Sequence, residues 1–116
     1  MTVLLVDDDE LFLVLIQRAL NEVRVPHVSA HSVDEAFSAL AANDIDIMIT
    51  DINLQDRLDG YELASEACAK YDGLMVIYMS GKRADRSFSP PISGPSLQKP
   101  VGREEIQQCV QTIMAS

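Results

Sequence analysis

The chain has no tryptophan, only two cysteines and no long hydrophobic run. A membrane helix needs about 20 consecutive apolar residues, and every apolar run here is much shorter. No basic segment precedes the apolar residues Val3 to Val6, so a secretory signal is not indicated either. We therefore expect a cytoplasmic protein that does not bind membranes. Cys68 and Cys109 lie at apolar spacing within expected helices, which favours packed free thiols over a disulfide.

Basic residues are scarce as well. Nine Lys and Arg face 18 Asp and Glu, and the formal net charge is -9. Nucleic-acid backbones attract Lys and Arg and repel a strongly acidic surface, so direct nucleic-acid binding is not expected. The 116 residues, 47% of them hydrophobic, have room for one core, and we expect a single domain over residues 1–116.

Short apolar runs alternate with segments of helical period along the whole chain. The runs Thr2 to Val6, Ile45 to Thr50 and Leu74 to Met79 are typical of strands buried on both faces of a parallel sheet. Pro26 to His31 and Ser96 to Lys99 are weaker strand candidates. This order predicts an α/β fold, a doubly wound parallel sheet with right-handed crossovers and helices on both faces.

The expected helices follow from apolar residues at helical spacing and from one capping signal. Ser32 and Glu35 have the form of a capping box, which predicts a helix start near Ser32. Proline, serine and glycine interrupt the pattern between Gly81 and Pro95, so any helix there is confined to about Lys82 to Phe88. The apolar stripes are Phe12, Ile16, Ala19, Leu20 and Val23; Val33, Ala36, Phe37, Leu40 and Ala41; Ala64, Ala67, Cys68 and Tyr71; and Ile106, Cys109, Val110, Ile113 and Met114.

Polar residues stand at the ends of the expected strands. They are Asp7, Asp8 and Asp9 after the first run, Asp51 after Thr50, Ser80 after Met79, and Lys99. In a parallel sheet these carboxyl ends meet at one edge, where ligands bind. Two carboxylates about 4 Å apart repel by roughly 4 kcal/mol at an effective dielectric near 20. A hard divalent cation relieves this repulsion, and Mg²⁺ typically takes one or two carboxylates together with waters and a phosphate oxygen. The cluster therefore predicts Mg²⁺ and phosphoryl chemistry.

Asp9 and Glu10 have a second explanation. Carboxylates are favourable in the first turn of a helix, where they face the positive end of the helix dipole. We expect these two residues to serve the helix that follows, and not to bind the metal.

The order and spacing of four motifs resemble the receiver domain of two-component response regulators, and the resemblance covers the whole chain. The motifs are Leu5-Val6-Asp7-Asp8-Asp9, Ile49-Thr50-Asp51-Ile52-Asn53-Leu54 leading to Leu58-Asp59-Gly60, Tyr78-Met79-Ser80-Gly81, and Gln98-Lys99-Pro100. The resemblance implies a flavodoxin-like, five-stranded (βα)5 fold with strand order 2-1-3-4-5. It also implies a cis peptide bond between Lys99 and Pro100.

The resemblance further implies a role for each site residue. Asp51 would be the phosphoacceptor, Asp7 and Asp8 would hold Mg²⁺ together with Asp51 and the Asn53 backbone carbonyl, and Ser80 and Lys99 would serve the phosphoryl group. The donor would be a histidine kinase or a histidine phosphotransfer protein, and the output a changed affinity for a protein target. Such a domain is a signalling phosphoacceptor and not an enzyme in the usual sense.

The chain departs from the family pattern in three places. The segment from Asp51 to Gly60 is one residue longer than usual, with Gln55 where proline is frequent, so a bulged loop is expected. Ser96 stands where the family usually has the aromatic residue that swings inward on phosphorylation. The segment from Gly81 to Pro95 replaces the usual fourth-helix region.

Two other functions remain open at this point. A phosphorylation-independent interaction module would explain the missing aromatic and the altered fourth-helix region. A small phosphatase of the haloacid dehalogenase type would explain the Asp-x-Asp pair of Asp7 and Asp9, although Leu11 stands where that motif has Thr or Val.

Overall fold

The computed structural model describes residues 1–81 and 92–115, which form five parallel strands and four helices. The strands are β1 (Val3–Val6), β2 (His27–Ala30), β3 (Ile47–Asp51), β4 (Met75–Ser80) and β5 (Ser96–Gln98). Their order in the sheet is β2-β1-β3-β4-β5, as the resemblance implied. The helix expected at about Lys82 to Phe88 lies outside the described residues.

The strand bounds differ slightly from those expected from the sequence. β1, β2, β3 and β4 begin one or two residues later, whereas β3 and β4 each extend one residue further. The extension has a clear cause, because Asp51 pairs with Met79 and Ser80 pairs with Gln98 in the parallel ladders. Two of the expected site residues therefore belong to the strands themselves.

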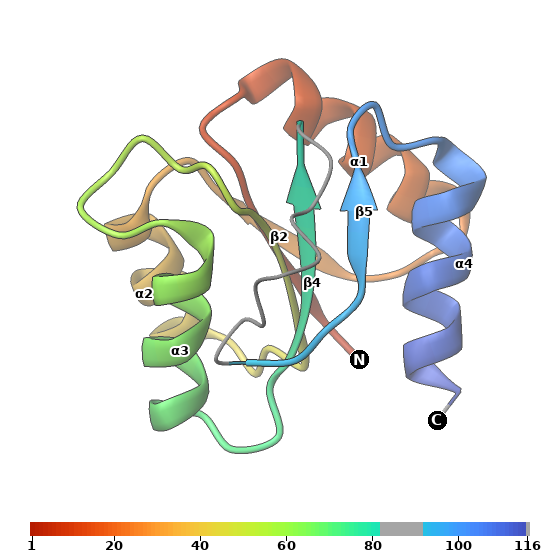
Figure 1. Ribbon diagram of the computed structural model, residues 1–116. Helices are drawn as coiled ribbons and strands as arrows, with labels where there is room; N and C mark the ends of the chain where they lie inside the picture. The colour runs from red at the N-terminus through yellow and green to blue at the C-terminus, as the bar shows by residue number, and fades with distance from the viewer. Residues whose placement is uncertain (82–91, 116) are drawn as a thin grey trace.

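Helices cover both faces of the sheet, as Figure 1 shows. Helices α1 (Glu10–Glu22) and α4 (Arg103–Met114) pack on one face, and α2 (Val33–Ala42) and α3 (Gly60–Lys70) on the other. Successive residues of a strand point to opposite faces, so Leu5 lies in the core under α1 and α4, and Leu4 lies in the core under α2 and α3. The continuous apolar runs arise because both faces are buried.

Side-chain caps begin three of the four described helices, whereas α4, with Gly102 at its N-cap position, begins without one. Ser32 is the N-cap of α2 and accepts a hydrogen bond from the Glu35 amide, as the sequence predicts. Glu35, however, accepts from the His31 amide and not from Ser32, so the expected capping box is incomplete. The complete capping box is at α3, where Asp59 and Glu62 cap each other's backbone amides.

Three further sequence expectations can be compared with the fold. Cys68 and Cys109 are free thiols within α3 and α4, as expected. The peptide bond between Lys99 and Pro100 is cis, also as expected. No helix in the described part of the chain has the length and apolarity that a membrane span requires.

Candidate functional site

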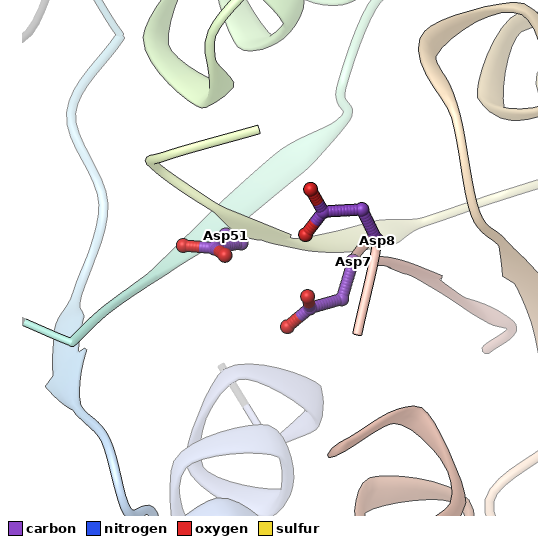
Figure 2. Close-up of side chains that lie close together, drawn as sticks. All are labelled: Asp7, Asp8 and Asp51. Atoms are coloured by element: carbon purple, nitrogen blue, oxygen red, sulfur yellow. The ribbon is translucent and has the colours of Figure 1, made fainter. Parts of the chain in front are cut away.

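Three carboxylates meet at the carboxyl edge of the sheet. Val6 of β1 pairs with Thr50 of β3, so the residues that follow, Asp7 and Asp51, lie next to each other. One carboxylate oxygen from each of Asp7, Asp8 and Asp51 lies within 4.8 Å of the other two, and Figure 2 shows the three side chains grouped together. Asp7 and Asp51 are buried, whereas Asp8 is exposed.

Asp9 does not join this cluster. Its side chain is the N-cap of α1 and accepts a hydrogen bond from the Phe12 amide at 3.3 Å. Glu10 lies in the first turn of the same helix. The strand ends were expected to bring four carboxylates together, and three of them form the cluster. The fourth, Asp9, caps α1 instead, where it accepts from an amide that has no partner within the helix.

Lys99 extends into the cluster from the end of β5. Its ammonium donates to Asp7 Oδ2 at 2.7 Å and to Asp51 Oδ2 at 3.2 Å. The Lys99 backbone amide donates to the Ser80 carbonyl at 2.7 Å. This hydrogen bond joins the residue that follows β5 to the end of β4. One cation therefore lies between the two buried carboxylates.

The protonation equilibria follow from burial and from this ion pair. Burial raises the pKa of Asp7, and the hydrogen bond from Lys99 offsets only part of that effect. For Lys99 burial acts to lower the pKa, but the hydrogen bond and charge of Asp7, together with those of Asp51, outweigh it and raise the pKa. With three carboxylates and one ammonium, the cluster has an excess of negative charge.

Ser80 and Asn53 both lie near Asp51. Ser80 is buried at the end of β4, one residue beyond the partner of Asp51 in the β3–β4 ladder. The Asn53 amide donates to Asp51 Oδ1 at 3.1 Å, so this oxygen and Asp51 Oδ2 have different partners. These contacts hold the Asp51 carboxylate in one orientation.

The donor set fits a hard divalent cation. Its side-chain ligands are all carboxylate oxygens, which Mg²⁺ prefers over nitrogen or sulfur. Asp8 is on the exposed side of the cluster, so a cation there has access to water and to an incoming phosphate. Mg²⁺ usually keeps several waters, and a site with one open side satisfies that requirement.

Two residues that the sequence analysis did not assign to the site also contact it. The Gln55 amide donates to Asp8 Oδ2 at 3.3 Å. Gly60 packs against the Asp51 carbonyl so closely that a Cβ at this position would be 2.2 Å from the oxygen. In the sequence Gly60 is only the last residue of the motif Leu58-Asp59-Gly60, and an amide contact such as that of Gln55 gives no sequence signal at all.

The loop between β3 and α3, which was expected to bulge, is attached to α2. Asp56 accepts from the Val33 amide at 2.9 Å, and this hydrogen bond lowers the pKa of Asp56. Arg57 pairs with Asp34 at 3.2 Å and lies over the Phe37 ring. Asp56 and Arg57 therefore attach the β3–α3 loop to the N-terminal end of α2.

Comparison with known proteins agrees with this geometry. The family model described as response regulator receiver domain matches residues 3–111. No curated protein sequence matches the chain. Similar solved structures include a two-component response regulator from Clostridium difficile, with 21% identity, a TM-score of 0.88, and coverage of 99% of this chain and 96% of that one.

Two further structures show the same fold. A response regulator receiver domain protein from Clostridium thermocellum has 21% identity, a TM-score of 0.86, and coverage of 98% of this chain and 94% of that one. A CheY-like receiver domain protein from Methanospirillum hungatei has 19% identity, a TM-score of 0.86, and coverage of 98% and 93%. Because the family model spans nearly the whole sequence, the chain belongs to the response regulator receiver domain family.

Proposed function

We propose that this receiver domain accepts a phosphoryl group on Asp51, with Mg²⁺ bound by Asp7, Asp8, Asp51 and the Asn53 backbone carbonyl. The observation that carries the proposal is the arrangement of Asp51, which lies within 4.8 Å of two other carboxylates and 3.2 Å from the Lys99 ammonium. An aspartate placed between a cation site and a lysine can act as a nucleophile toward phosphorus, since both neighbours neutralise charge on the phosphoryl oxygens.

The donor in this proposal is a phosphohistidine of a histidine kinase or a histidine phosphotransfer protein. An Asp51 oxygen attacks phosphorus, an acyl phosphate bond forms, and the bond from phosphorus to the donor imidazole breaks. Lys99 then has a phosphoryl oxygen as its partner, and the Ser80 hydroxyl donates to another. Bound Mg²⁺ would supply charge neutralisation at the same oxygens.

The output in this proposal is a changed affinity for a protein target. Self-catalysed phosphorylation and dephosphorylation would be the only chemistry, and the site would act in the cytoplasm within a single domain over residues 1–116. Neither nucleic acid nor membrane is a direct partner in this scheme. A net charge of -9 supports this part of the proposal.

One observation favours the phosphorylation-independent interaction module as a second candidate. Ser96 is exposed at the start of β5, and it has no ring that could swing inward. The phosphatase alternative required Asp7 and Asp9 to act together. Asp9 instead caps α1, which removes the reason for that alternative.

The proposal is tested by intact-mass spectrometry after incubation with Mg²⁺ and acetyl phosphate. We expect one added phosphoryl group in the wild type and none in Asp51→Asn. Asp9→Asn is the matched control, because it makes the same substitution at a nearby carboxylate that lies outside the cluster, and asparagine also caps helices well. It should accept the group normally.

A second measurement separates the two candidate functions. Backbone NMR with beryllofluoride, a phosphoryl mimic, should show shifts that begin at Asp51 and extend to the surface that changes. Binding of a partner that persists in Asp51→Asn, with no adduct and no beryllofluoride response in the wild type, would favour the interaction module.

A further inference from the structure

An aromatic ring contacts the site lysine from α1. The Lys99 ammonium lies over the Phe12 ring, 4.2 Å from its centroid. Phe12 is 8% exposed, and the Lys99 side chain is 19% exposed, so little water reaches the contact. In the sequence Phe12 is recognisable only as part of the apolar stripe of α1.

The position of the ring does not depend on the lysine. Phe12 belongs to the core cluster between the sheet and helices α1 and α4. Its backbone amide donates to the N-cap residue Asp9, which places it in the first turn of α1, directly after the acidic cluster. The core and the cap therefore hold the ring, and the ring is a fixed surface against which the flexible lysine side chain can rest.

The Phe12 ring attracts the Lys99 ammonium in addition to the two carboxylates that accept its hydrogen bonds. An ammonium has three N–H donors. The Lys99 ammonium donates to Asp7 Oδ2 and to Asp51 Oδ2. The face of an aromatic ring carries negative partial charge and attracts a cation, more strongly where water is excluded. An aliphatic residue of similar volume would fill the space but would not attract the charge.

We infer that Phe12 is a positioning residue for Lys99, whose ammonium is held by the face of the ring between Asp7 and Asp51. The inference rests on the proposed function in one respect, that Lys99 serves a phosphoryl group on Asp51. The contact itself exists without phosphorylation and can be measured separately.

The contact is tested first in the unphosphorylated protein by NMR of the Lys99 side chain. Protons above an aromatic ring are shielded, so the Lys99 ε-methylene protons should resonate upfield of their usual position. Phe12→Met replaces the ring by an unbranched apolar side chain. In this variant the ε-methylene protons of Lys99 should resonate at their usual position. Ile16→Val is the matched control, since Ile16 is buried in the same core cluster one turn further along α1, and it should leave the Lys99 shift unchanged.

The effect on the site is tested by the rate of Asp51 phosphorylation from acetyl phosphate. Phe12→Met should lower this rate about tenfold, which corresponds to about 1.4 kcal/mol and is within the range of a desolvated cation–π contact. Ring fluorination at position 12 provides the decisive series, because it keeps the shape of the ring and withdraws charge from its face. The rate should fall step by step with the number of fluorines, whereas Ile16→Val should keep the wild-type rate.

Three results would overturn the inference. One is a Lys99 shift that does not respond to Phe12→Met. Another is a rate that does not respond to fluorination, even if Phe12→Met is slow, since the ring would then act by packing alone. The third is an equal loss of rate in Ile16→Val. If the wild type accepts no phosphoryl group, the proposed function fails, and the NMR comparison still decides whether Phe12 positions Lys99.

Discussion

The acidic cluster should make the stability of this protein depend on Mg²⁺, and Asp8 is the residue at which to test this. Asp8 is exposed and has no ion pair with Lys99 in the structure, unlike Asp7 and Asp51. Asp8→Asn therefore removes one negative charge from the cluster and leaves its lysine contacts in place. An asparagine oxygen can still accept the hydrogen bond that Gln55 donates to Asp8.

The expected magnitude follows from the distances within the cluster. One oxygen of Asp8 lies within 4.8 Å of an oxygen of Asp7 and of an oxygen of Asp51. At that separation each pair repels by about 1 kcal/mol in a water-like dielectric, which is appropriate for an exposed carboxylate. Since Lys99 opposes part of the sum, Asp8→Asn should raise the free energy of unfolding by about 1 kcal/mol when no divalent cation is present.

Bound Mg²⁺ should reverse the order of the two proteins. A cation that binds only the folded state adds about 2.7 kcal/mol at about 100 times its Kd. The wild type should show this increment, and Asp8→Asn, which lacks one ligand, should lose most of it. The assay is urea unfolding with and without Mg²⁺, followed by far-UV circular dichroism because the chain has no tryptophan to report by fluorescence.

Asp9→Asn provides the matched control for this experiment. It makes the same charge change at the adjacent position, but Asp9 caps α1 and lies outside the cluster. It should keep the full Mg²⁺ increment. The reasoning would be refuted if Asp8→Asn were less stable than the wild type without Mg²⁺, or if it responded to Mg²⁺ as strongly as Asp9→Asn.

Two further predictions concern packing and pH. Gly60→Ala places a Cβ 2.2 Å from the Asp51 carbonyl oxygen, so urea unfolding should show that the free energy of unfolding falls by about 3 kcal/mol. Gly102→Ala is the control, because nothing lies within 4 Å of a Cβ at that position. Equal losses in the two variants would contradict the packing argument. Burial raises the pKa of Tyr78 from 10.0 to about 12, so the unfolded chain loses this proton first and stability falls as pH rises from 10 to 12. The wild type should lose about 2 kcal/mol more than Tyr78→Phe over that interval, and parallel curves for the two proteins would count against it.

The sequence alone predicted the kind of fold and the edge at which polar residues gather. Short, continuous apolar runs such as Leu74 to Met79 occur where helices cover both faces of a parallel sheet. The structure has strand β4 in this segment, with residues in the cores on both faces. Residues that follow such runs must meet at the carboxyl edge, and the distances among Asp7, Asp8 and Asp51 agree with that expectation. Whether these residues accept a phosphoryl group remains a prediction.

Local signals were less reliable where two similar ones competed. The sequence pattern favoured a capping box at Ser32 and Glu35, but the complete box forms at Asp59 and Glu62. Glu35 accepts from the amide of His31, one residue before the N-cap. Which backbone amide Glu35 accepts from depends on the path of the chain between β2 and α2. The sequence pattern does not specify that path.

Contacts between distant segments were decided by the tertiary structure alone. The Phe12 ring under Lys99 joins the first turn of α1 to the end of β5, and the hydrogen bond from Val33 to Asp56 joins the β3–α3 loop to the earlier helix α2. Hydrophobic periodicity and strand-end residues are properties of a segment and its neighbours in the chain, so they can be read in order. The contacts of a ring, an amide or a missing Cβ depend on how separate elements pack, and only the folded chain brings those atoms together.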